Sequence, residues 1–319
     1  MKTHSPPETQ HPETELWAIT CYFNPVGYQR RLKNYRIFRQ TLNVPLVAVE
    51  LSFEGQFHLK PGYADILIQL TAESVLWQKE RLLNIALEQL PPTCRYVAWL
   101  DCDVTFDNKD WALQAQEALS RYPIIQPFSE VKEPLPNEVA QDDSEKRREG
   151  ISLAYLMSKE QVPEDLLCGN MRVDYNCNSG LAWAARREIL DTDGFYDTCI
   201  MGSGNRAMLC AAMGQPEIGI RSLRMTPSWA EHYTAWANRH YEHTGGEIGF
   251  VPGTLIHHWH GNLKNRRYQS RHEDFSTFDF NPARDIAMDP SGIWRWASDK
   301  PAMHRYAAQY FKDRKEDTL

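Results

Sequence analysis

The sequence predicts an α/β protein with a mostly parallel central sheet and helices on both faces. Over the first 107 residues, apolar β-prone runs alternate with runs of helical period, a pattern typical of strand–helix–strand units. The chain has 319 residues, enough for one large domain or two small ones. Its 42% hydrophobic and 24% charged residues are typical of a globular protein with a buried core.

The elements of the first half follow in order. Strands are expected at four apolar runs, residues 16–23, 44–53, 64–70 and 96–100. Helices are expected at 28–42 and 74–90, where apolar residues recur at a spacing of three to four. Asn24-Pro25 ends the first strand and Pro91-Pro92 ends the second helix. Ligands of such sheets bind at the carboxyl ends of the strands, which here carry Asn24, Glu50, Asp101 and Asp103.

The rest of the chain is less periodic. Residues 130–150 are rich in charge and proline and predict a mobile loop, and 250–256 form a β-like run. A final helix is expected at 299–315, with Asp299 as its cap and Pro301 in its first turn. We therefore expect a disordered leader at 1–15 and one domain at 16–275. Within the domain, 16–107 form the nucleotide-binding half and 108–275 the acceptor-side half. Residues 276–319 are expected to form a helical extension without chemistry.

Charge and cysteine content narrow the classes of function. With 35 Lys and Arg against 42 Asp and Glu, the formal charge is −7, which argues against a protein built mainly to bind nucleic acid. No run approaches the ~18 apolar residues of a transmembrane helix, so none is predicted. The seven cysteines are odd in number and irregularly spaced, which favours reduced thiols and a cytoplasmic protein.

Two carboxylates follow the buried strand at 96–100. Asp101 and Asp103 are two residues apart, so in an extended chain they point to the same side. Mg²⁺ and Mn²⁺ commonly join such carboxylates to substrate phosphates. Asp is also frequent in turns at strand ends, but its position after a buried strand favours a functional site.

A histidine cluster follows the run at 250–256. Its order is His257-His258-Trp259-His260-Gly261, with Lys264 three residues later. A neutral imidazole is a metal ligand, glycine lets the backbone approach a phosphate, and lysine neutralises it. Basic residues continue the segment, namely Arg266, Arg267 and Arg271.

Together these motifs resemble the GT-A glycosyltransferases, a Rossmann-like superfamily that uses nucleotide-sugar donors. Asp101 and Asp103 match its D-x-D motif, and His258, Gly261 and Lys264 match the H-x-x-G-x-x-K motif of several of its families. The resemblance implies that Asp101, Asp103 and His258 bind Mn²⁺ or Mg²⁺, with His260 as the alternative ligand. It also implies that Gly261 and Lys264 contact the diphosphate. The Pro-Trp pair that usually follows the lysine is replaced by Asn265-Arg266.

Other segments carry the same resemblance. Residues 176–181 resemble the N-S-G segment that faces donor sugar and acceptor, which assigns a catalytic position to Asn178. Residues 202–205 resemble the segment before the catalytic helix, where many inverting members have an acidic residue and this chain has Asn205. Because Asn205 is no general base, either the base lies elsewhere or the enzyme is retaining. Four further residues match donor-binding positions, namely Asn24, Glu50, Lys79 and Arg81.

The resemblance implies a metal-dependent transferase that moves a sugar from a nucleotide-diphosphate donor, with a UDP-sugar favoured, to a glycan or other hydroxyl. The 130–150 loop is then a candidate lid. One or two of the tryptophans in the acceptor-side half are expected to line the sugar site, among Trp183, Trp229, Trp236 and Trp259.

Three alternatives stay open. The same fold serves a non-catalytic protein that binds nucleotide sugars or glycans. A hydrolytic or zinc protein would use His232, His240, His243 and the 257–260 histidines, although they form no H-E-x-x-H motif. A transferase acting on modified nucleic-acid bases would use the basic run 264–271 against an unfavourable net charge.

Overall fold

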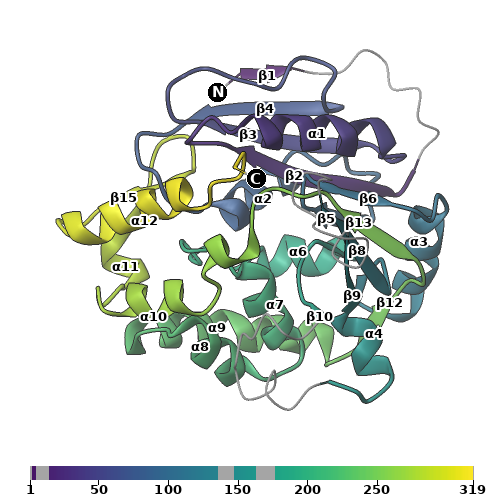
Figure 1. Cartoon of the computed structure of the whole chain (residues 1–319). Coiled ribbons are helices and arrows are strands. Elements are labelled where there is room, and N and C mark those ends of the chain that lie inside the picture. Colours follow the sequence, from purple (N-terminus) through teal and green to yellow (C-terminus); the bar gives the residue numbers. More distant parts are fainter. Residues whose placement is uncertain (1, 5–13, 136–146, 163–176, 319) are drawn as a thin grey trace.

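An eight-stranded, mostly parallel sheet forms the centre of the molecule (Figure 1). The computed structural model describes residues 2–4, 14–135, 147–162 and 177–318. The neighbours β4, β3, β2 and β5 are parallel, whereas β11 runs antiparallel between β5 and β7, and β1 antiparallel beside β4. In spatial order the strands are β1 (Lys2–His4), β4 (Ile66–Thr71), β3 (Leu46–Ser52), β2 (Leu16–Phe23), β5 (Tyr96–Leu100), β11 (Ala182–Arg186), β7 (Ile124–Gln126) and β12 (Ile248–Phe250).

Helices cover both faces of this sheet, as the fold class predicts. Because side chains alternate along a strand, Ile19 and Cys21 of β2 pack into one core, and Ala18 and Tyr22 into the other. The second core is closed by α1 (Gln29–Thr41) and α3 (Trp111–Arg121). The first core is closed by α2 (Lys79–Leu87), α6 (Arg187–Asp193), α7 (Gly204–Ala212), α8 (Pro216–Leu223), α9 (Pro227–Thr244) and α12 (Pro301–Asp313).

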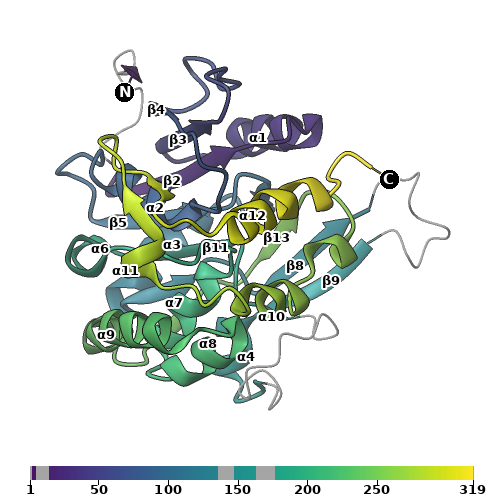
Figure 2. The same cartoon turned by 90° about the vertical axis from the view of Figure 1, so that its left-hand side faces the viewer.

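A second sheet of five strands flanks the carboxyl end of β5. Its strands are, in spatial order, β10 (Cys177–Asn178), β9 (Arg147–Ser152), β8 (Glu130–Pro134), β13 (Thr254–His257) and β6 (Val104–Phe106). In Figure 2, β8, β9 and β13 lie together on one side, and α7, α8 and α9 lie together below. Because β6 follows the D-x-D segment and pairs with β13, the sheet brings the two predicted motifs to one place.

The last part of the chain returns to the first half. The remaining short elements are α4 (Leu153–Ser158), the 3₁₀ helix η1 (Leu263–Arg266), α10 (Ser270–Ser276), α11 (Pro282–Asp285), and the hairpin of β14 (Ile286–Met288) and β15 (Trp294–Trp296). From α12, the ring of Phe311 contacts the rings of Phe23 and Trp77. The yellow helix α12 accordingly lies beside β2 and α2 in Figure 1.

Five expectations about the elements are wrong in part. The second helix begins at Lys79 rather than near residue 74, because Ser74 and Gln78 accept hydrogen bonds from the backbone of β15 at 3.3 and 2.7 Å. The run 250–256 is split between two sheets at Pro252-Gly253, where Gly253 has φ +145°.

The predicted loop and leader also contain strands. The two ends of the 130–150 segment pair as the antiparallel strands β8 and β9, and 136–146 lie outside the described residues. Residues 2–4 of the predicted disordered leader pair with β4, and 5–13 lie outside the described part. The 276–319 segment contains a β hairpin besides its helices. Within the described ranges, no helix combines the length and apolar character needed to cross a bilayer.

Candidate functional site

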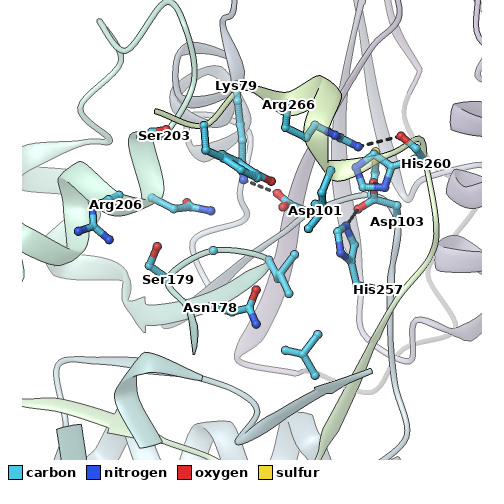
Figure 3. A pocket seen from close by; sticks show the side chains of 18 of the residues that line it. Lys79, Asp101, Asp103, Asn178, Ser179, Ser203, Arg206, His257, His260 and Arg266 are labelled. Atoms are coloured by element: carbon cyan, nitrogen blue, oxygen red, sulfur yellow. Dashed lines mark hydrogen bonds and ion pairs between the residues drawn. The ribbon is translucent and has the colours of Figure 1, made fainter. Parts of the chain in front are cut away.

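A cavity of about 430 Å³ lies at the carboxyl ends of β2 and β5. Its lining includes Asp101 and Asp103 after β5, His257 at the end of β13, His260 after β13, and Lys79 at the start of α2. Figure 3 shows Asp103, His257 and His260 at one end of the cavity, with Ser179, Ser203 and Arg206 toward the other. The sheet edge predicted to hold the site therefore does hold a pocket with titratable side chains.

The two carboxylates of the D-x-D segment have different partners. Asp101 pairs with the Nζ atom of Lys79, and its backbone N–H donates to Leu181 O at 2.8 Å. Asp103 faces the histidines, with Oδ1 3.7 Å from His257 Nε2 and Oδ2 3.4 Å from His260 Nδ1. The segment thus presents a charge-paired carboxylate and a histidine-facing carboxylate to one cavity.

Asp103, His257 and His260 form the group of potential metal ligands in the described part of the chain, with ligand atoms within 4.8 Å of one another. The expected ligand His258 is outside this group, and its Nε2 atom lies 3.3 Å from Thr105 Oγ1. The reason is strand alternation, since consecutive side chains at the end of β13 point to opposite sides. The alternative ligand His260 does join Asp103, together with His257, which the motif did not single out.

These residues fit a divalent cation. Asp103 Oδ1 is buried and has no hydrogen-bond partner within the described residues. His257 Nδ1 lies 2.8 Å from Glu133 Oε1, and His260 Nδ1 lies 2.9 Å from His258 O. The contact on His257 Nδ1 orients its Nε2 atom toward Asp103 and a metal. In His260, the same Nδ1 atom faces both His258 O and Asp103. One carboxylate and two imidazoles suit Mn²⁺ and other first-row divalent ions.

The three side chains of the group differ in their electrostatics. Although burial acts to lower it, the pKa of His257 is raised by the hydrogen bond to Glu133 and the charge of Asp103. Burial raises the pKa of Asp103, and His257 acts in the opposite direction. Burial lowers the pKa of His260 well below its usual range, and the nearby Arg266 adds to this effect. His260 is therefore neutral, which is the form that binds a metal.

Gly261 and Lys264, the expected diphosphate contacts, are not among the residues that line the cavity. Gly261 has φ +99°, and a Cβ atom there would lie 3.0 Å from Arg314 O and 3.1 Å from the Cα atom of Glu316. Its role is close packing against the chain that follows α12. Lys264 forms part of η1, where its backbone N–H donates to the capping Asn262 side chain.

Three of the expected donor-binding residues also have structural partners outside the cavity. Asn24 bonds to the backbone of Tyr28. Glu50 is buried and accepts hydrogen bonds from the backbone N–H groups of the 58–59 turn. Arg81 pairs with Asp197 at 3.1 Å. Polar side chains at these positions stabilise turns and helix packing, the usual role of such residues.

Asn178 and Asn205, the expected catalytic positions, do line the cavity with Lys79. Asn205 is the second residue of α7, and its Nδ2 atom lies close to Gly180. The N–S–G segment and the start of α7 therefore meet at the cavity.

Glu80 is a site residue that the sequence did not reveal. It lines the cavity although it is only 4% exposed. Burial raises the pKa of its carboxyl group to about 7, against the opposing charge of Lys79. Its carboxyl group packs on the first residue of α7, where a Cβ on Gly204 would lie 2.2 Å away. In the sequence Glu80 looks like an ordinary helix residue, so no local signal marks it.

The cavity is also richer in cations than the motifs suggest. Besides Lys79, five arginines line it, namely Arg31, Arg206, Arg266, Arg271 and Arg314. Two of them, Arg266 and Arg271, belong to the basic run after the histidine cluster. Arg31 comes from α1, and Arg314 comes from the segment expected to lack chemistry. Trp77 is the tryptophan that lines the cavity, and the four tryptophans named above do not.

No family model matches the chain, and no curated protein matches it in sequence. Solved structures align with it at low identity. A mannosyltransferase from Pyrobaculum calidifontis in complex with GDP-Man and Mn²⁺ is 11% identical, and the alignment covers 93% of this chain and 69% of that chain with a TM-score of 0.43. For S. aureus TarS 1-349 in complex with UDP-GlcNAc, identity is 12%, coverage 78% and 60%, and the TM-score 0.40.

The catalytic domain of Drosophila beta1,4galactosyltransferase 7, in complex with xylobiose, is 10% identical. The alignment covers 91% of this chain and 98% of that chain, with a TM-score of 0.37.

Proposed function

We propose that this chain is a metal-dependent glycosyltransferase that uses a nucleotide-diphosphate sugar. The observation that supports this most is the Asp103–His257–His260 group, which shares one cavity with the Asp101–Lys79 pair and several arginines. We favour a UDP-sugar as donor and a glycan or other hydroxyl compound as acceptor.

The residues have distinct roles in this proposal. Asp103, His257 and His260 would hold Mn²⁺ or Mg²⁺, which supplies positive charge to the departing diphosphate. Lys79, held in place by Asp101, adds a fixed cation beside the same leaving group. Asn178 and Asn205 offer amide groups for hydrogen bonds to the sugar or acceptor.

Glu80 is our candidate for the proton acceptor. Its carboxyl group has a pKa of about 7, which matches a general base at neutral pH. It lines the cavity close to the helix that carries Asn205. Asn205 is an amide and is no general base. In this proposal the base therefore lies elsewhere, at Glu80.

The test is the thermal stability of the full chain with UDP, GDP, ADP and CDP, each with Mn²⁺ and with EDTA. A nucleotide at 100 times its Kd adds about 2.7 kcal/mol of stability, which is readily seen. We expect one nucleoside diphosphate to stabilise the protein only with Mn²⁺, and Asp103→Asn to abolish that shift. The matched control is His258→Ala, because that side chain lies outside the metal group.

Turnover is then measured as release of the nucleoside diphosphate from its sugar derivative. Absence of any metal-dependent nucleotide shift would overturn the proposal. Binding without release from any donor sugar would instead favour the non-catalytic alternative.

A further inference from the structure

Four of the arginines that line the cavity are mostly buried, and two of them pair with one buried carboxylate. Arg31 lies on α1, Arg266 on η1, Arg271 on α10 and Arg314 directly after α12. We call these four residues the arginine cluster. The carboxylate is Glu316, which is 0% exposed and is not among the residues that line the cavity. Arg31 and Arg314, which pair with Glu316 and also line the cavity, therefore lie between the two.

Glu316 holds two members of the cluster in fixed positions. Its carboxylate accepts hydrogen bonds from Arg31 Nε and Nη2 at 2.6 and 3.0 Å, and from Arg314 Nε at 2.5 Å. The Arg314 guanidinium also lies over the Trp77 ring at 5.3 Å and is 4% exposed. Bidentate pairing and stacking leave these side chains little freedom, so they are ordered before any ligand arrives.

The other two members are fixed by neutral groups. Arg271 Nη2 donates to Ser203 Oγ at 2.6 Å, and its Nη1 donates to Arg266 O at 3.2 Å. Arg266 Nη2 donates to His260 O at 2.8 Å, which joins the cluster to the metal group. Arg266 Nε is buried and has no hydrogen-bond partner among the described residues.

Charge within the cluster is unbalanced. Within the described residues, Glu316 is the carboxylate that forms ion pairs with members of the cluster, namely Arg31 and Arg314, and no ion pair of Arg266 or Arg271 is found there. Nearly buried charges are costly unless they are compensated. An anion that enters the cavity would supply the missing charge and would meet donors already in place.

We propose that the arginine cluster is an oxyanion subsite for a phosphate group, assembled by Glu316 and able to bind without a metal ion. Glu316 acts as a positioning residue, and Arg314 and Arg266 contact the ligand. When the phosphate is part of a nucleotide-sugar donor, the inference rests on the function proposed above. The site itself requires only the chain and an oxyanion.

The probe is inorganic pyrophosphate, titrated calorimetrically into the full chain in EDTA. We expect saturable binding, weakened at least about tenfold in Arg314→Met and in Glu316→Gln. Arg314→Met keeps an apolar side chain over Trp77, so it remains informative even if Glu316→Gln does not fold. The control is Glu273→Gln, which removes a carboxylate from an exposed pair with Arg224, and we expect it to leave the affinity unchanged.

Two results would overturn the subsite: no pyrophosphate binding to the unmodified chain in EDTA, or equal affinity in all variants. Its failure is distinguishable from failure of the proposed function. Metal-dependent nucleotide binding without pyrophosphate binding in EDTA would retain the transferase and reject the subsite. Pyrophosphate binding without any metal-dependent nucleotide binding would do the opposite. Mn²⁺ affinity, measured alone, is expected to be the same in Arg314→Met as in the unmodified chain.

Discussion

At the scale of single residues, the site depends on which histidine faces Asp103. His257 and His258 are adjacent, yet only the former joins the metal group. We expect His257→Ala to weaken Mn²⁺ binding at least about tenfold, because a ligand is lost. His258→Ala should change it by less than about twofold. Calorimetry or the electron paramagnetic resonance signal of free Mn²⁺ measures both; equal losses would reject the assignment.

Glu80 predicts a pH dependence of stability. Its pKa is raised in the folded state to about 7 from an ordinary value of 4.5. At a pH below 4.5, Glu80 is protonated in both the folded and the unfolded chain and does not affect stability. At a pH between 4.5 and about 7, Glu80 ionises in the unfolded chain but stays protonated in the folded chain. Rising pH therefore destabilises the fold across this window, by up to about 3 kcal/mol.

Glu80→Gln removes this cost. We expect the variant to be more stable than the unmodified chain at about pH 8 and nearly equal to it at about pH 4. If Glu80 is the proton acceptor, kcat also falls by about 10²–10⁴-fold while nucleotide affinity is retained. Urea unfolding at the two pH values and steady-state kinetics check the two statements separately. A stability difference that does not depend on pH would contradict the raised pKa.

At the scale of elements, the start of α7 packs closely against the Glu80 side chain of α2. A Cβ on Gly204 would lie 2.2 Å from the Glu80 carboxyl group. Gly204→Ala should therefore destabilise the protein by about 1–3 kcal/mol through overpacking. In a Glu80→Ala background the same change should cost much less, because the obstructing atoms are gone. A double-mutant cycle by urea unfolding measures this coupling, and strict additivity would contradict it.

Regular elements with a clear period were predictable from the sequence, as β2, β3, β5 and α1 show. The start of α2 was not, because bonds from β15, more than 200 residues away in the sequence, hold Gln78 outside the helix. The division of 250–256 between two sheets depends on Pro252-Gly253 and on partners that no local pattern reveals. His257 was missed because the direction of its side chain depends on where β13 ends, and no local pattern in the sequence marks that position.

The candidate site was predictable where its residues belong to a short sequence motif. Asp101, Asp103, Lys79, Asn178 and Asn205 all line the cavity. Glu80, Arg31 and Arg314 were not predictable, because their position depends on how distant helices pack. Glu50 and Arg81 fit the motif pattern but have structural partners.

At the scale of the whole molecule, α12, near the carboxyl end of the chain, packs against the first half of the fold. Phe311 is 3% exposed, and its ring contacts Phe23 and Trp77. Phe311→Ala should lower the free energy of unfolding by about 3–5 kcal/mol. Leu113→Ala is the control, because Leu113 is 69% exposed and should change it by less than about 0.5 kcal/mol. Urea unfolding compares them; similar values would show that α12 contributes little.

The segment after α12 is also hydrogen-bonded to the start of α1. Asp317 accepts hydrogen bonds from the backbone N–H groups of Gln29 and Arg30 at 2.8 Å, and Tyr28 Oη accepts one from Lys315 N at 3.0 Å. This attachment has a practical consequence for anyone producing or labelling the protein. A purification tag or fluorophore joined after this segment would follow directly on the residues that hold Arg314 and Glu316 in place, so it risks disturbing the arginine cluster.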